Sequence, residues 1–82
     1  MVEKIDEPVD VMAAFFGGQL VPRLFKWHGR RYAVKEVTSM WTDLEGQFRR
    51  YFYAVTTDAP NLYELVFSTK DLRWLLIKIY FD

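Results

Sequence analysis

Side chains that could carry acid–base or nucleophilic chemistry are few in this sequence of 82 residues. It has one histidine, His28, and no cysteine, which excludes a zinc site built on paired histidines or thiolates and a cysteine nucleophile. Ser39 and Ser68 stand in no nucleophile-elbow pattern. We therefore predict no catalytic residues, no metal site and no cofactor, and expect that the chain is not an enzyme.

The carboxylates do not change this expectation. Asp43 and Glu45 stand two positions apart, but a calcium loop needs several more oxygen ligands at fixed spacing. Glu36 and Glu64 stand in predicted strands among basic residues, and we interpret them as ion-pair partners. We therefore expect these acidic side chains to be solvated or ion-paired, rather than to form a catalytic or metal-binding cluster.

Basic and aromatic residues alternate in several places, and this combination points to binding. Proteins that bind single-stranded nucleic acid combine a cationic groove with exposed rings on which the bases stack. Residues 11–35 hold five Lys or Arg and no acid, whereas residues 1–10 hold four acids and one Lys. The candidate nucleic-acid-binding residues are Arg23, Lys26, Trp27, Arg30, Arg31, Arg49 and Arg50.

An alternative explains the same residues without nucleic acid. The net charge is zero, which argues against indiscriminate binding to polyanions. In a small β domain most aromatic rings form the core, and Arg side chains lie over them. Exposed Trp, Tyr and Arg also anchor protein interfaces. The chain could therefore be a sheet that associates with itself or binds a partner protein through an edge strand, and Trp27 serves as a stacking ring only if it is exposed.

These residues depend on one central element, residues 24–34, which we predict to be a β-hairpin. Its aromatic residues alternate with basic ones on either side of a turn that contains Gly29. Two registers are compatible with the pattern. With Gly29-Arg30 as the loop, Trp27 lies opposite Tyr32; with His28-Gly29 as the loop, Phe25 lies opposite Tyr32.

The remaining pattern predicts an all-β fold. We expect a six-stranded, mostly antiparallel meander that forms a coiled sheet or a small, partly open barrel. Residues 1–8 are predicted to be a flexible N-terminal segment and residues 9–82 a single β domain. Residues 9–16 suit a strand, with a short helix as the rival interpretation, and Gly17-Gly18 suits a turn better than a phosphate loop. The other predicted strands are residues 20–27, 31–41, 48–57, 62–67 and 72–81, with a loop at 42–47 and a turn at 58–61.

Chain length, the first residues and hydropathy give an expectation for the number of domains and for the cellular location. A chain of 82 residues makes one domain. Its first residues are acidic, unlike a signal peptide, and no apolar run approaches the length of a membrane span. We therefore expect a cytoplasmic protein without a membrane partner.

Several spaced motifs resemble a known family. They are Phe25-x-Trp27-x-Gly29-Arg30-x-Tyr32-x-Val34, Trp41, Tyr51-x-Tyr53-x-Val55, Tyr63-Glu64-Leu65, and Trp74-x-Leu76 with Tyr80 and Asp82. This pattern resembles short, uncharacterised bacterial proteins that share a domain of unknown function. Related segments occur alone and at the C-terminal end of proteins resembling Y-family DNA-repair polymerases. The resemblance implies an accessory β module near DNA and supplies no catalytic residues. The chain departs from the family where Asp58-Ala59-Pro60-Asn61 replaces an expected glycine turn.

Overall fold

The computed structural model describes residues 1–81, which form eight β-strands and no helix. All strand pairs are antiparallel. The all-β expectation is confirmed, but the expected number of strands was too small. The strands are β1 (Val2–Pro8), β2 (Asp10–Phe16), β3 (Gln19–Trp27), β4 (Arg30–Ala33), β5 (Glu36–Glu45), β6 (Phe48–Thr56), β7 (Leu62–Ser68) and β8 (Arg73–Tyr80).

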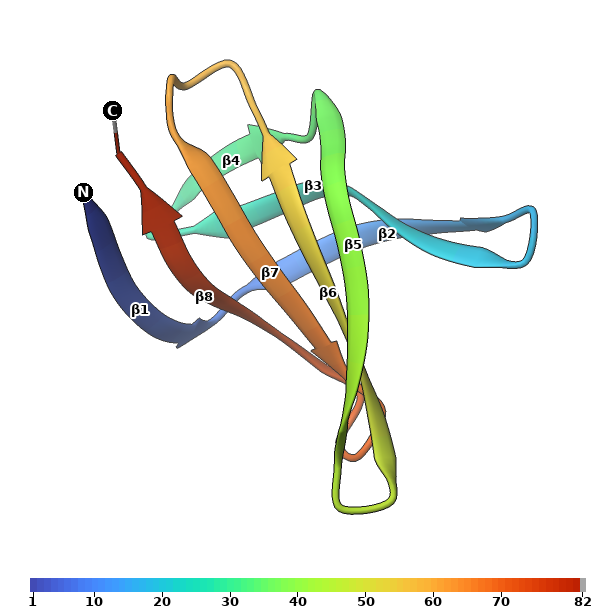
Figure 1. Ribbon diagram of the computed structural model, residues 1–82. Helices are drawn as coiled ribbons and strands as arrows, with labels where there is room; N and C mark the ends of the chain where they lie inside the picture. The colour runs from blue at the N-terminus through green and yellow to red at the C-terminus, as the bar shows by residue number, and fades with distance from the viewer. Residues whose placement is uncertain (82) are drawn as a thin grey trace.

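The strands form two sheets rather than one coiled sheet or a small barrel. The larger sheet has five strands in the order β1-β8-β7-β6-β5, and the smaller has three in the order β2-β3-β4. The smaller sheet crosses behind the larger one, and the β2–β3 hairpin extends beyond the β5 edge (Figure 1). Neither sheet closes on itself within residues 1–81. In the same part of the chain we find no helix that could span a membrane.

The first additional strand comes from the N-terminal segment. The structure places Val2–Pro8 of the predicted flexible segment 1–8 in a strand of the large sheet, where β1 pairs with β8 from Val2 opposite Tyr80 to Pro8 opposite Leu75. The ladder shifts register between Lys4 and Glu7. Polar residues, a proline and a register shift are all features of an edge strand, so the properties that suggested disorder instead fit the outermost position in a sheet.

The second additional strand comes from a division of the predicted strand 31–41. β4 ends at Ala33, and β5 begins at Glu36 in the other sheet. β5 also continues through most of the predicted loop 42–47 and ends at Glu45. The two-residue connection therefore carries the chain from the small sheet to the large one.

The hairpin of β3 and β4 has one of the two expected registers. His28 and Gly29 form the loop, with φ angles of 52° and 75°. Phe25 pairs with Tyr32, and their rings stack with centroids 4.9 Å apart. Positive φ at both loop positions is what a type I′ turn requires. Residues 10–16 form strand β2, so the rival helix is excluded.

The core lies between the two sheets. The small sheet contributes Phe25 and Tyr32, and the face of the large sheet toward it, here called the inner face, contributes the rest. In β8 the ladder shifts register between Leu76 and Lys78, so the inner face does not follow the strict alternation that the sequence indicates. The buried residues contributed by the large sheet are Tyr53, Val55, Tyr63, Leu65, Leu76 and Ile79.

Candidate functional site

The predicted basic residues of the β3–β4 hairpin lie on different faces. Lys26 is paired with Arg31, and Trp27 with Arg30, in successive positions of the ladder. Successive residues of a strand point to opposite faces, so Lys26 and Arg31 face away from the core. Arg30 instead extends over the Tyr32 ring, with its guanidinium carbon 5.1 Å from the ring centroid. One surface therefore presents two of these three cations.

Trp27 is held by its neighbours rather than free to stack. Its Nε1 donates a hydrogen bond to Glu7 Oε1 at 2.9 Å, and the His28 Nε2 lies 2.9 Å from the same oxygen. The Trp27 ring stacks on the His28 ring and packs against the core. These two hydrogen bonds lower the pKa of Glu7. The sequence did not indicate this cluster, because Glu7 lies in the segment predicted to be flexible.

The two basic residues of β6 lie apart from this hairpin, beside the turn between β5 and β6 (Figure 1). Arg50 donates from Nε and Nη2 to the two carboxylate oxygens of Asp43, at 2.8 and 2.6 Å. This bidentate hydrogen bonding lowers the pKa of Asp43 and raises that of Arg50. Arg49 is exposed on the same strand. The seven predicted residues therefore do not line a single groove.

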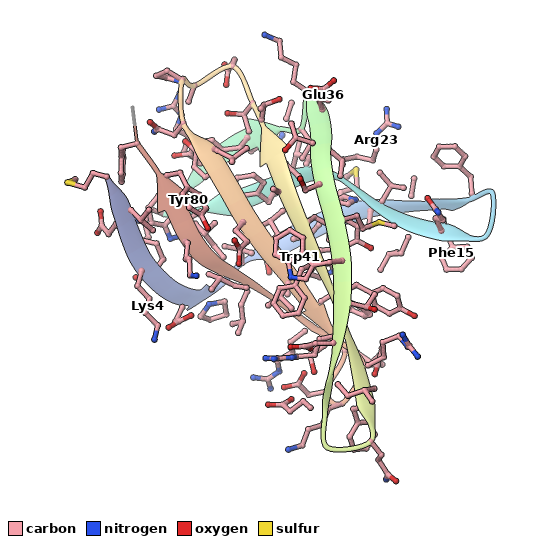
Figure 2. All side chains as sticks on the ribbon, in the orientation of Figure 1. Lys4, Phe15, Arg23, Glu36, Trp41 and Tyr80 are labelled. Carbon is pink, nitrogen blue, oxygen red and sulfur yellow. The ribbon has the colours of Figure 1, made fainter. Side chains whose placement is uncertain are left out.

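A set of five cations without an ion pair in the described part of the chain remains on the hairpin and its flanks, distributed over more than one face. All its members are exposed, and within residues 1–81 none lies within 4.0 Å of a carboxylate oxygen. Figure 2 shows Arg23 extending away from the ribbon at the base of the protruding hairpin. We call this set the basic cluster: Arg23, Lys26, Arg30, Arg31 and Lys35.

A mostly apolar hollow in the surface lies elsewhere. It is a groove of about 410 Å³ between the β2–β3 hairpin and the inner face of the large sheet. Phe15 and Leu20 come from the hairpin, and Met40 comes from β5. We call it the aromatic groove; it is lined by Phe15, Gly18, Gln19, Leu20, Met40, Tyr51, Tyr53, Phe67 and Thr69.

One hydrogen bond ties the two sides of the aromatic groove together. The Tyr53 hydroxyl donates to the backbone carbonyl of Leu20. The Tyr53 side chain is buried, and this burial raises the pKa of its hydroxyl. Because Leu20 pairs with Phe15 near the Gly17-Gly18 turn, the bond ties the outer part of the hairpin to β6.

The outer part of the hairpin projects because no third strand covers it. β4 pairs with β3 only from Leu24 to Trp27, whereas β2 pairs with β3 as far as Gln19. Gly17 and Gly18 close the tip with φ angles of 60° and 76°. Phe15 is consequently 74% exposed although it lines the groove.

The β5 edge beside the groove is also apolar. Met40, Trp41 and Leu44 are exposed along it. Met40 faces the aromatic groove, while Trp41 lies on the opposite face of the large sheet and stacks on Phe52 with centroids 5.4 Å apart. Figure 2 shows Trp41 on this outer face, in front of β5 and β6.

Comparison with known proteins identifies the family. Residues 1–80 match the family described as a domain of unknown function, DUF6504. The chain belongs to the DUF6504 family. No curated protein and no solved structure matches it.

In this DUF6504 chain the acidic residues also differ from their predicted roles. Glu64 is buried on the outer face of the large sheet and accepts a hydrogen bond from the Tyr80 hydroxyl at 3.0 Å, rather than forming an ion pair. Glu36 is exposed, and it too forms no ion pair within residues 1–81. Across the same residues no group of three His, Asp or Glu side chains could hold a metal ion. Asp82, the last residue of the family pattern, lies outside the described residues.

The sequence carried only a partial signal for the aromatic groove. Phe15 and Phe16 before Gly17-Gly18 mark an apolar hairpin tip, but the pattern by itself predicts only a strand and a turn. Nothing local indicates that β4 stops short and leaves this tip uncovered. The groove depends on contacts between Leu20 and Tyr53, which are far apart in the chain.

Proposed function

We propose that this chain is a non-catalytic adaptor that binds a partner protein through the aromatic groove. The observation that carries the proposal is the exposure of large apolar side chains around a groove with an aromatic floor. Full burial of a Phe or Met side chain contributes about 1.5–3 kcal/mol of favourable free energy. A partner that covers Phe15 and Met40 would therefore gain a large part of the free energy that a stable complex needs. Contiguous exposed apolar surface of this kind marks interaction sites.

The family resemblance supports a cellular process in which this adaptor acts. The resemblance implies that segments related to this chain sometimes stand at the C-terminal end of proteins resembling Y-family DNA-repair polymerases. We place the module in the bacterial cytoplasm, where it joins a partner to such DNA transactions without performing chemistry itself. The groove then supplies the contact between proteins, and the larger assembly supplies the catalysis.

Site-specific photo-crosslinking tests this proposal. A benzophenone amino acid replaces Phe15 in one variant and Leu72 in another, because the two side chains are similarly exposed, at 74% and 72%, and only Phe15 lines the groove. In extract of the source cells, irradiation is expected to yield a defined protein adduct from position 15 and not from position 72. Adducts of equal yield at both positions, or none from position 15, would reject the proposal.

A second function, contact with nucleic acid, is favoured by the basic cluster. Its five cations are exposed and unpaired within residues 1–81, so they are free to neutralise phosphates. Because Trp27 is held by Glu7, this contact uses charge and not stacking on that ring. A Lys26→Ala, Arg31→Ala double variant should then bind a labelled oligonucleotide more weakly, with a smaller dependence on salt. Absence of wild-type binding at low salt would remove this candidate.

A further inference from the structure

We infer that the free edge of β5 from Ser39 to Glu45 is a docking edge for an extended segment of a partner protein that alternates apolar and basic residues. This inference rests on the adaptor function proposed above and adds where and how the partner binds. The incoming segment would become a sixth strand of the large sheet. Main-chain hydrogen bonds would hold it, and its side chains would supply the specificity.

β5 has a longer uninterrupted paired run than the other edge strands. β5 pairs with β6 in an uninterrupted run of seven residues from Ser39 to Glu45. The other edge strands, β1, β2 and β4, pair with their neighbours in uninterrupted runs of at most four residues. Short runs and register shifts are ways in which proteins protect sheet edges from pairing, and β5 lacks both over this stretch.

The edge strands also differ in amino-acid composition. β1 carries Lys4 and Pro8, and β4 carries Arg30 and Arg31. Lysine, proline and other charged residues on an edge discourage pairing with another chain. From Ser39 to Glu45, β5 has no Lys, Arg or Pro and exposes Met40, Trp41 and Leu44. Its charges in this stretch are Asp43, which Arg50 binds, and the exposed Glu45. Its register shift is confined to the stretch between Val37 and Ser39, before the run begins.

The side chains on the two faces of β5 indicate which residues a partner strand should alternate. Met40, Thr42 and Leu44 alternate on the inner face, where Met40 lines the aromatic groove. Trp41, Asp43 and Glu45 alternate on the outer face. An added strand therefore places every second side chain beside Met40, Thr42 and Leu44. The side chains between them lie beside the Trp41 indole, the exposed Glu45 carboxylate and Asp43, whose carboxylate Arg50 already binds. Apolar residues suit the first row, and Lys or Arg suits the second, through charge and cation–π contact.

The same charges argue against a second copy as the occupant. β5 contains Glu36, Asp43 and Glu45 and no basic residue. In any register of β5 with another β5, these acids meet only neutral or acidic side chains. Like charges directly opposite one another destabilise a strand pair, so the edge favours a partner of opposite charge.

Binding of synthetic peptides tests this inference. The probe is a fluorescent, end-capped peptide of eight residues that alternates lysine and valine, measured by anisotropy with the full chain. One control has the same composition in two blocks, four lysines and then four valines, and so cannot present two different faces. A second control carries N-methyl groups on alternate residues, which remove main-chain donors. We expect the alternating peptide to bind at least ten times more tightly than either control.

Variants locate the binding to β5. Leu44→Lys places a cation on the inner row and should weaken binding about tenfold. Leu72→Lys is the matched control, because Leu72 is also exposed but lies in the turn before β8, and it should leave binding unchanged. Equal affinity for the alternating and block peptides, no binding of any peptide, or binding that Leu44→Lys leaves intact would overturn the inference.

Two further results separate this inference from the adaptor proposal. A protein adduct at position 15 together with no peptide binding would reject the β5 docking edge and keep the adaptor function. No adduct together with no peptide binding would reject both. A wild-type dimer in sedimentation that Leu44→Lys dissociates would make a second copy the occupant and would also overturn the inference.

Discussion

At the scale of single residues, Glu7 connects the first strand to the β3–β4 hairpin. One of its carboxylate oxygens lies 2.9 Å from both Trp27 Nε1 and His28 Nε2. The hydrogen bonds from Trp27 and His28 lower the pKa of Glu7 below its ordinary value of 4.5. The ionised carboxylate is therefore favoured in the folded chain, and the stability of the protein depends on pH through this group.

The direction of that dependence follows from the lowered pKa. A carboxyl group with a lower pKa in the folded state stabilises it above the unfolded pKa and loses that effect as pH falls through the folded value. We expect the wild type to melt at a higher temperature than Glu7→Gln at pH 6, and the difference to shrink as pH falls below about 4.5. Thermal melts of both proteins from pH 7 to pH 3 check this, and a difference independent of pH would contradict it.

Tyr53 and its hydrogen bond to Leu20 make a second prediction at this scale. Tyr53→Phe removes the donor and leaves the Leu20 carbonyl without it, which should lower the free energy of unfolding by about 1 kcal/mol. Urea denaturation measures this value. Tyr51→Phe is the matched control, because Tyr51 also lines the groove but its hydroxyl makes no hydrogen bond within residues 1–81. An equal effect of both substitutions would show that the hydroxyl of Tyr53 has no special role.

At the scale of elements, local patterns predicted the strands and turns better than the sheet edges. The His28-Gly29 turn, β6 and β7 follow from turn residues and β-branched or aromatic composition, which act over a few positions. β1 was missed because a polar edge strand depends on its partner, here β8, for its structure. The register shift in β8 near Ile77 escaped notice for a similar reason, since its effect appears only against β7 and β1.

Removal of β1 tests the corrected topology. Deletion of residues 1–7 would break the ladder with β8 and remove Glu7, so we expect a clear fall in melting temperature by circular dichroism. Lys4→Ala is the control, because the Lys4 side chain is exposed and its ion pair is with Asp6 of its own strand. If the truncated chain melted like the full chain, residues 1–8 would be the flexible segment that the sequence alone had indicated.

At the scale of the whole molecule, charge and apolar surface lie in different places. The basic cluster lies on the small sheet and its flanks, whereas the exposed Phe15, Met40 and Leu44 lie around the aromatic groove and on β5. The sequence indicated the basic residues because they are close together in the chain. It could not show that β4 stops short, that β5 is an edge, or that Tyr53 meets Leu20, since these are long-range contacts.

The central claim is that a partner binds at the aromatic groove and β5, and one measurement tests it most directly. The isotope-labelled chain is titrated with the protein captured at position 15, and its backbone amide signals are followed by NMR. We predict that the signals that move will cluster at Phe15, Leu20, Met40 and Leu44, while those of Lys26 and Arg31 stay in place. Movement confined to Lys26, Arg31 and their neighbours would contradict the claim and return the function to the basic cluster.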